Sequence, residues 1–132
     1  MPEPAPTRLF AFKLIVSSLE AMEAFYKETF GFEKTGAVET DAILETLMRA
    51  PGDAQAPLLV LYKHKDGRAL NVGNAHGPIV LAVADVDRFY AAALANGATP
   101  SRPPFDTPTA RVGFVFDPEG HEIELLHFAS PA

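Results

Sequence analysis

The second half of this chain repeats the plan of its first half. An apolar, strand-like run at residues 10–16 is followed by Ser17-Ser18 and by an amphipathic helix that ends at Gly31. A second apolar run at residues 79–83 is followed by Asp85 and by a helix that ends at Gly97. The helix starts, Ser18 and Asp85, lie 67 positions apart, and the two glycines lie 66 apart. A duplicated unit of about half the chain predicts a cup built from two similar halves.

The composition indicates one compact domain. The 132 residues fit a single domain, and a hydrophobic content of 48% supports a core. The proline-rich residues 1–8 are predicted to be a flexible tail, and residues 9–132 a single domain with modules at about 9–70 and 77–128. The tail lacks the cationic start of a signal peptide, and no apolar run reaches the roughly 20 residues that span a bilayer. We therefore expect a cytoplasmic protein with no membrane partner.

Cysteine content and charge exclude further classes of site and partner. The chain has no cysteine, which excludes disulfides, a thiolate nucleophile and a zinc-thiolate site. Its formal net charge of −6 argues against binding to the phosphates of a nucleic acid.

Residue periodicity predicts β-α-β-β-β twice, an α+β arrangement. Alternation along a strand sends successive side chains to opposite faces. On the first strand, the residues predicted to lie under the helices are Phe10, Phe12, Leu14 and Val16. The opposite face then carries Ala11, Lys13 and Ile15. On the last strand that face carries Glu124, while Ile123 and Leu125 are directed to the core. The run at residues 58–65 is apolar on both faces at first, and Val60, Tyr62 and His64 are assigned to the face away from the helices. Four prolines within residues 99–109 predict a stiff loop there, because proline cannot donate a backbone hydrogen bond.

Several motifs together resemble one superfamily. They are Ser18-Leu19-Glu20, Phe30-Gly31-Phe32, the run from Gly77 to Val83, and the run Asp117-Pro118-Glu119-Gly120-His121-Glu122-Ile123-Glu124-Leu125. The chain resembles, over about residues 9–128, the vicinal oxygen chelate superfamily, which includes glyoxalase I, extradiol dioxygenases and the fosfomycin- and bleomycin-resistance proteins. The resemblance implies two tandem βαβββ modules whose curled mixed sheet surrounds a ligand cavity, and a homodimer.

The resemblance also implies where a metal would bind. Metal-dependent members take ligands from four strands, and the matching positions here are Ala11, Val60, Pro78 and Glu124. Alanine, valine and proline side chains carry no donor atom, and one carboxylate is too little for a tight transition-metal site. We therefore expect no metal cofactor.

A rearranged site for one divalent metal is the alternative, with His64 and His76 joining Glu124. Each histidine lies an even number of residues from an empty position, so alternation allows both on the cavity side. Each would also sit roughly 7 to 13 Å along its strand from the usual centre. The competing interpretation is that both are exposed histidines at strand ends.

Lys13 is the only charge in an apolar strand, and it shares the predicted cavity face with Ala11. Its stem can lie on apolar surface while its ammonium reaches water. Alternatively it pairs with Glu124 or with a ligand anion, which makes Lys13 and Glu124 the candidate catalytic acid and base. The full set of predicted ligand contacts is Ala11, Lys13, Val60, Tyr62, His64, Pro78, Phe105, Arg111 and Glu124, with the facing of the Arg111 strand left open.

Three functions are compatible with this pattern. The first is a metal-independent protein that binds a small, partly apolar molecule, as the resemblance to bleomycin-resistance proteins implies. The second is a glyoxalase-like metal-dependent lyase, isomerase or dioxygenase with a rearranged site around Glu124. The third is metal-free acid–base catalysis by Glu124 and Lys13.

Overall fold

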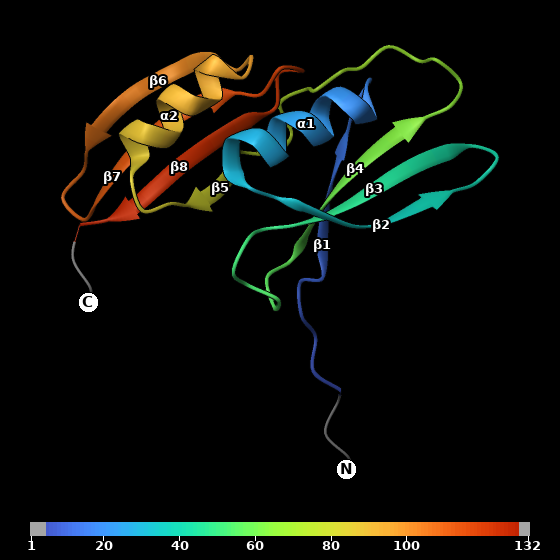
Figure 1. Ribbon diagram of the computed structural model, residues 1–132, viewed down its shortest axis with the longest axis horizontal. Coiled ribbons are helices and arrows are strands. Elements are labelled where there is room, and N and C mark those ends of the chain that lie inside the picture. The colour runs from blue at the N-terminus through green and yellow to red at the C-terminus, as the bar shows by residue number, and fades with distance from the viewer. Residues whose placement is uncertain (1–4, 130–132) are drawn as a thin grey trace.

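The computed structural model describes residues 5–129, which form two βαβββ modules (Figure 1). Module 1 comprises β1 (Ala11–Ile15), α1 (Leu19–Phe30), β2 (Glu33–Glu39), β3 (Ile43–Arg49) and β4 (Leu58–His64). Module 2 comprises β5 (Ile79–Ala82), α2 (Val86–Ala95), β6 (Thr99–Asp106), β7 (Ala110–Phe116) and β8 (Glu122–Phe128). The predicted α+β fold of two tandem modules is confirmed.

Each module builds its own four-stranded mixed sheet. Sheet 1 has the order β1-β4-β3-β2 and sheet 2 the order β5-β8-β7-β6, and the two sheets do not join. Part of the predicted tail, residues 1–4, lies outside the described residues, and residues 5–8 belong to no helix or strand. In the part of the chain that the structure describes, no helix is both long and apolar enough to span a membrane.

Both helix starts and the end of α1 follow the predicted capping residues, whereas α2 ends one residue earlier than predicted, with Asn96 rather than Gly97 as its C-cap. Ser18 Oγ accepts a hydrogen bond from Ala21 N at 3.1 Å, and Asp85 Oδ1 accepts one from Arg88 N at 3.0 Å. Each cap satisfies one of the backbone N–H groups that an α-helix leaves free at its start. Gly31 ends α1 with a φ of 75°, a left-handed conformation that glycine adopts without steric cost.

The core lies between the helices and one face of each sheet. Met22, Phe25 and Tyr26 of α1 pack over Leu14, Val16, Leu59 and Leu61, and α2 packs over Val115, Ile123 and Leu125. The prediction for the start of β1 is wrong, because Phe10 and Phe12 are 58% and 41% exposed. Of the four residues predicted to lie under the helix, only Leu14 and Val16 are buried there. Both lie near the C-terminal end of β1 and pack against α1.

β6 occupies the stretch predicted to be a loop, so that prediction is also wrong. It is the edge strand of sheet 2, and its register against β7 shifts between Pro100 and Arg102 and again between Arg102 and Phe105. Prolines are tolerated at an edge and at such irregularities, because no neighbouring strand needs their missing N–H. β2, the edge strand of sheet 1, was likewise not assigned from the sequence.

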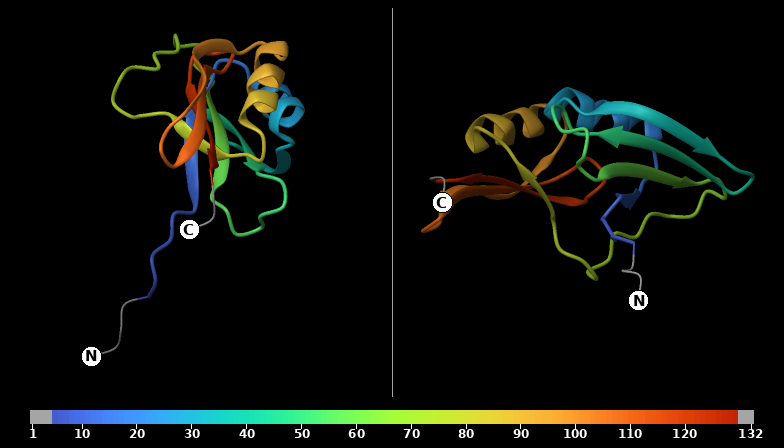
Figure 2. Two further views of the ribbon diagram at one scale, coloured as in Figure 1. Left: turned by 90° about the vertical axis from the view of Figure 1, so that its left-hand side faces the viewer. Right: turned by 90° about the horizontal axis from the view of Figure 1, so that it is seen from below.

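The modules meet through their helices. The rings of Phe30 and Phe89 stack with centroids 5.9 Å apart, and Asn96 Nδ2 donates to Thr29 Oγ1 at 3.0 Å. The two sheets extend to opposite sides of this helix pair (Figure 2).

A second link joins the β7–β8 turn of module 2 to the β1–α1 junction of module 1; we call it the clasp. Glu119 accepts hydrogen bonds from Ser17 N at 2.5 Å and Ser18 N at 2.9 Å. Tyr26 donates from its hydroxyl to Asp117 Oδ2 at 2.8 Å. His121 Nδ1 lies 2.8 Å from Asp117 Oδ2, and its Nε2 lies 2.8 Å from the Ile15 carbonyl oxygen.

The clasp favours a protonated His121. Its two ring nitrogens face a carboxylate and a carbonyl, which only accept hydrogen bonds, so an imidazolium satisfies both contacts. Burial lowers the pKa of His121, but the hydrogen bond and charge of Asp117 outweigh it and hold that pKa above its usual value. Burial, followed by the charge of Asp117, raises the pKa of Tyr26 well above its usual value, so this hydroxyl stays a donor.

Candidate functional site

The face of sheet 1 that points away from the helices carries part of the predicted ligand set. Strand register places Lys13 beside Val60 and Ile15 beside Tyr62. Leu59 and Leu61 belong to the core beneath α1, whereas Val60 and Tyr62 do not, which agrees with the predicted facing of Val60 and Tyr62. We refer to this surface, and to its equivalent on sheet 2, as the helix-free faces.

Lys13 pairs with Glu45, a residue that the sequence analysis did not single out. Lys13 Nζ lies 2.5 Å from Glu45 Oε2, and the ammonium sits 5.3 Å from the centre of the Tyr62 ring. The Glu45 side chain is only 9% exposed, so Lys13 supplies the counter-charge for a nearly buried carboxylate. The sequence does contain a signal for this pair, because Glu45 is the one acidic residue in the otherwise largely apolar strand β3.

Glu124 lies on the helix-free face of sheet 2. Its register neighbours are Val80 and Phe114, and Phe105 stacks on Phe114 with ring centroids 6.5 Å apart. The guanidinium of Arg102 covers the Phe105 ring at 4.5 Å. Among the described residues Glu124 has no ion-pair partner, so Lys13 and Glu124 do not form a pair within the chain.

Arg111 lies on the other side of sheet 2. It pairs with Asp87 of α2 through two hydrogen bonds of 2.7 and 2.8 Å, and with Asp106 at 3.0 Å. These hydrogen bonds raise the pKa of Arg111 above its usual value. Arg111 therefore shares no face with Glu124, and its side chain is engaged at the helix–sheet boundary rather than at the predicted ligand site.

The alternative metal ligands are dispersed within one chain. His64 stands at the end of β4 with its ring 5.1 Å from that of Tyr62, and His76 packs against Phe12 at 6.2 Å. Over residues 5–129, no three His, Asp or Glu side chains come close enough together to hold a metal ion. Of the four positions implied by the resemblance, Ala11, Val60 and Pro78 offer no side-chain donor.

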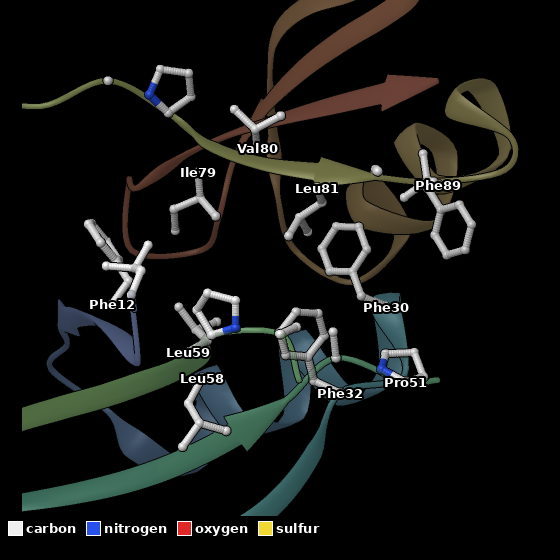
Figure 3. Close-up of a pocket in the computed structure, with 18 of the residues that line it drawn as sticks. Phe12, Phe30, Phe32, Pro51, Leu58, Leu59, Ile79, Val80, Leu81 and Phe89 are labelled. Carbon is white, nitrogen blue, oxygen red and sulfur yellow. The ribbon is translucent and has the colours of Figure 1, made fainter. Parts of the chain in front are cut away.

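The principal cavity lies between the modules, and Val80, the register neighbour of Glu124 on β5, is part of its wall. It has a volume of about 730 Å³, and β5 runs along it opposite the start of β4 and the end of α1. Figure 3 shows Ile79 and Leu81 of β5 directed toward Leu59 and Phe30. Among the residues predicted as site residues, Pro78 and His76 line this inter-module cavity.

No local sequence motif marks this cavity, so the cavity could not be predicted from the sequence. Phe12 was predicted to lie beneath a helix, and the structure instead places it on the cavity wall. The remaining aromatic wall residues, Phe30, Phe32 and Phe89, follow helical or strand periodicity and are predicted only as core.

Comparisons with known proteins agree with this fold. The sequence profile of the Glyoxalase/Bleomycin resistance protein/Dioxygenase superfamily matches residues 8–125. No curated protein sequence matched the chain. The trypanothione-dependent glyoxalase I of Leishmania major superposes with a TM-score of 0.80 at 21% identity, covering 92% of this chain and 87% of that one.

Two further solved structures show the same fold. Glyoxalase I of Zea mays superposes with a TM-score of 0.80 at 18% identity over 90% of this chain, which spans only 44% of the maize protein. A glyoxalase/bleomycin resistance protein from Albidiferax ferrireducens superposes with a TM-score of 0.66 at 25% identity, covering 90% of this chain and 95% of that one. The tandem modules and the profile match together show that this chain belongs to the glyoxalase/bleomycin resistance protein/dioxygenase, or vicinal oxygen chelate, superfamily.

Proposed function

We propose that the protein is a cytoplasmic, metal-independent small-molecule-binding protein of the glyoxalase/bleomycin resistance type. The observation that carries the proposal is the composition of the helix-free faces. Three of the four superfamily metal positions there are Ala11, Val60 and Pro78, which cannot coordinate an ion. A site of this kind holds its ligand by apolar contact, with few polar groups to orient it.

Exposed apolar side chains on the same faces support this reading. Ile15 is 40% exposed on sheet 1, and Val80 and Phe128 are 52% and 62% exposed on sheet 2. The polar groups beside them are the Lys13–Glu45 pair and Glu124. They would orient a ligand that carries a cationic or hydrogen-bonding group.

We propose further that the protein works as a homodimer. Within residues 5–129, β1 pairs only with β4 and β5 only with β8, so each leaves one edge without a strand partner. Uncovered strand edges that carry apolar side chains tend to associate. A second copy would cover these edges, and sedimentation equilibrium tests for it.

Metal content separates this proposal from the enzyme alternative. Freshly purified protein is analysed for metals and then titrated with Ni²⁺, Zn²⁺, Mn²⁺ and Fe²⁺ while its thermal midpoint is followed. We expect substoichiometric metal and no stabilisation. Stoichiometric metal that is lost in Glu124→Gln would replace the proposal with a metal-dependent enzyme built around Glu124.

Ligand binding is tested by a thermal-shift screen of aromatic and antibiotic-like compounds. A hit on the helix-free faces should be lost in Ile15→Arg or Phe128→Arg, whose side chains are already exposed, so folding is little affected. Ala91→Arg, on the exposed surface of α2, is the matched control and should bind normally. Hits that survive both face variants would show that these faces do not form the site.

A further inference from the structure

Two charged residues on the helix-free face of sheet 2, Arg102 and Glu124, form no ion pair among the described residues. Phe114 lies between them, because it is the register neighbour of Glu124 on β8 and of Arg102 on β6. Glu122, another acid of β8, is already engaged, since it accepts a hydrogen bond from Ser101 Oγ at 2.7 Å. The face therefore presents a carboxylate and a guanidinium on the two sides of one phenyl ring.

An irregularity in β6 brings Arg102 onto this face beside Phe105. The two residues are three positions apart, and in a regular strand residues three apart point to opposite faces. The register against β7 shifts between them, and the guanidinium carbon of Arg102 lies 4.5 Å from the centre of the Phe105 ring. Bulges of this kind re-aim side chains and are frequent beside functional sites.

Two stacked rings hold the guanidinium in place. Phe105 and Phe114 stack with centroids 6.5 Å apart and planes inclined by 21°, and the guanidinium carbon of Arg102 is 5.4 Å from the centre of Phe114. A guanidinium that stacks on a ring keeps its N–H groups directed outward in its own plane, where they match the two oxygens of a carboxylate. The side chain is thus oriented for an anion before any ligand arrives.

A shortage of acids does not explain the lack of a partner for Arg102. The chain has 17 acidic and 11 basic residues. The nearest acid along the strand, Asp106, pairs instead with Arg111 on the other side of sheet 2. Arg102 is therefore the cation of this face that remains available to a ligand.

The sheet geometry sets the spacing between the two charges. Arg102 and Glu124 lie on β6 and β8, with β7 between them. Neighbouring strands are about 4.8 Å apart, so the two backbone positions are separated by roughly 10 Å. A ligand that reaches both charges must carry its own charged groups at the two ends of an apolar body, rather than on one carbon atom.

We propose that the helix-free face of sheet 2 binds a zwitterionic aromatic molecule, and that Arg102 selects its carboxylate. The carboxylate accepts hydrogen bonds from the guanidinium, the aromatic body lies against Phe114, and an ammonium group at the far end pairs with Glu124. This inference rests on the proposed function, because it names the class of ligand that the face holds. β6 is the edge strand opposite β5, so a dimer formed along the free edge of β5 leaves Arg102 accessible.

Two isomeric probes test the spacing of the charges. In para-(aminomethyl)benzoic acid the ammonium and the carboxylate stand at opposite ends of a ring, whereas phenylglycine carries both on one carbon atom. Each is titrated at pH 7 into isotope-labelled protein while the NMR shifts of the backbone amides are followed. We expect saturable binding of the first probe, with shifts in β6, β7 and β8, at an affinity at least about fivefold above that of phenylglycine, which corresponds to roughly 1 kcal/mol.

Substitutions test the role of each group. Arg102→Gln and Glu124→Gln should each weaken binding of para-(aminomethyl)benzoic acid by about fivefold and remove the preference over phenylglycine. Phe105→Leu should weaken it similarly although the charge remains, because the guanidinium loses its support, and Phe105→Tyr, which keeps the ring, should bind as the wild type does. Arg88→Gln, at an exposed position of α2, is the matched control and should leave affinity unchanged.

Three outcomes would each overturn this inference. They are the absence of saturable binding to the wild type, equal affinities for the two isomers, and an affinity that Arg102→Gln does not change. An uncharged analogue, methyl para-methylbenzoate, separates such a failure from failure of the proposed function. If its binding is lost in Phe128→Arg but is unaffected by Arg102→Gln, and the zwitterion does not bind, the proposed function stands without this inference. Stoichiometric bound metal would instead overturn the metal-independent function, whereas a preference that depends on Arg102 would still support the inference.

Discussion

Tyr26→Phe tests whether the clasp holds the modules together. Tyr26 is fully buried, and its hydroxyl donates at 2.8 Å to Asp117, which is 2% exposed. The substitution keeps the ring and removes only this donor. Asp117 retains His121 Nδ1 and the backbone N–H groups of Glu119 and His121. The expected loss is therefore one buried hydrogen bond to an ionised group, without a cavity.

A hydrogen bond to a charged partner contributes about 1.5 to 3 kcal/mol. That is a large part of the 5 to 15 kcal/mol that stabilises a typical domain. For a chain of this length, 1 kcal/mol corresponds to roughly 3 to 5 °C in thermal midpoint. We thus expect Tyr26→Phe to lower the midpoint by roughly 5 to 15 °C.

Urea unfolding followed by circular dichroism at pH 6 gives the free energy of unfolding directly. Tyr90→Phe is the matched control, because Tyr90 is half-buried against the core and its hydroxyl has no hydrogen-bond partner among the described residues. The control should change the free energy by less than about 0.5 kcal/mol. Equal effects of the two substitutions at an unchanged urea dependence would refute the assignment of the clasp as a stabilising link.

Two other predictions concern stability. Because the folded-state pKa of His121 is raised, its stabilising contribution is complete below an unfolded pKa of about 6.5 and is lost as pH rises through the folded value. The difference in unfolding free energy between wild type and His121→Gln should therefore shrink from pH 5.5 to pH 9, at about 25 °C; a pH-independent difference would contradict the protonated clasp. Gly31→Ala should cost about 1 to 2 kcal/mol in urea unfolding, since its φ of 75° is left-handed. Gly36→Ala, whose added Cβ would have an ordinary 3.9 Å contact with Leu47, should cost much less, and equal costs would show that backbone strain is not the cause.

Local features of the fold could be read from neighbouring residues. Ser18, Asp85 and Gly31 mark helix ends because their effects act within one turn of the chain. The alternation of β8 predicted that Ile123 and Leu125 are buried, and both are fully buried. The facing of β4 did not follow in this way, because the strand is apolar on both faces and alternation does not decide between them.

The candidate site was only partly accessible from sequence. The donor-free positions Ala11, Val60 and Pro78 came from superfamily resemblance, and side-chain chemistry alone limits what they can bind. The ion-pair partner of Lys13 could not be predicted from the sequence. Glu45 comes close to Lys13 only because β1, β4 and β3 lie next to one another in sheet 1. The face on which Arg111 lies is fixed by its ion pair with Asp87 of α2, a contact between segments that are distant in the sequence.

The sequence by itself determined the duplicated module, the starts of both helices and the buried face of β8. These properties depend on residue type and on spacing within a few positions. The tertiary structure alone decided that His121 belongs to a clasp, that the proline-rich stretch is an edge strand and that a cavity opens between the modules. Each depends on contacts between distant segments, such as the hydrogen bond between Ser17 and Glu119 across 102 positions, and local sequence carries no signal for them.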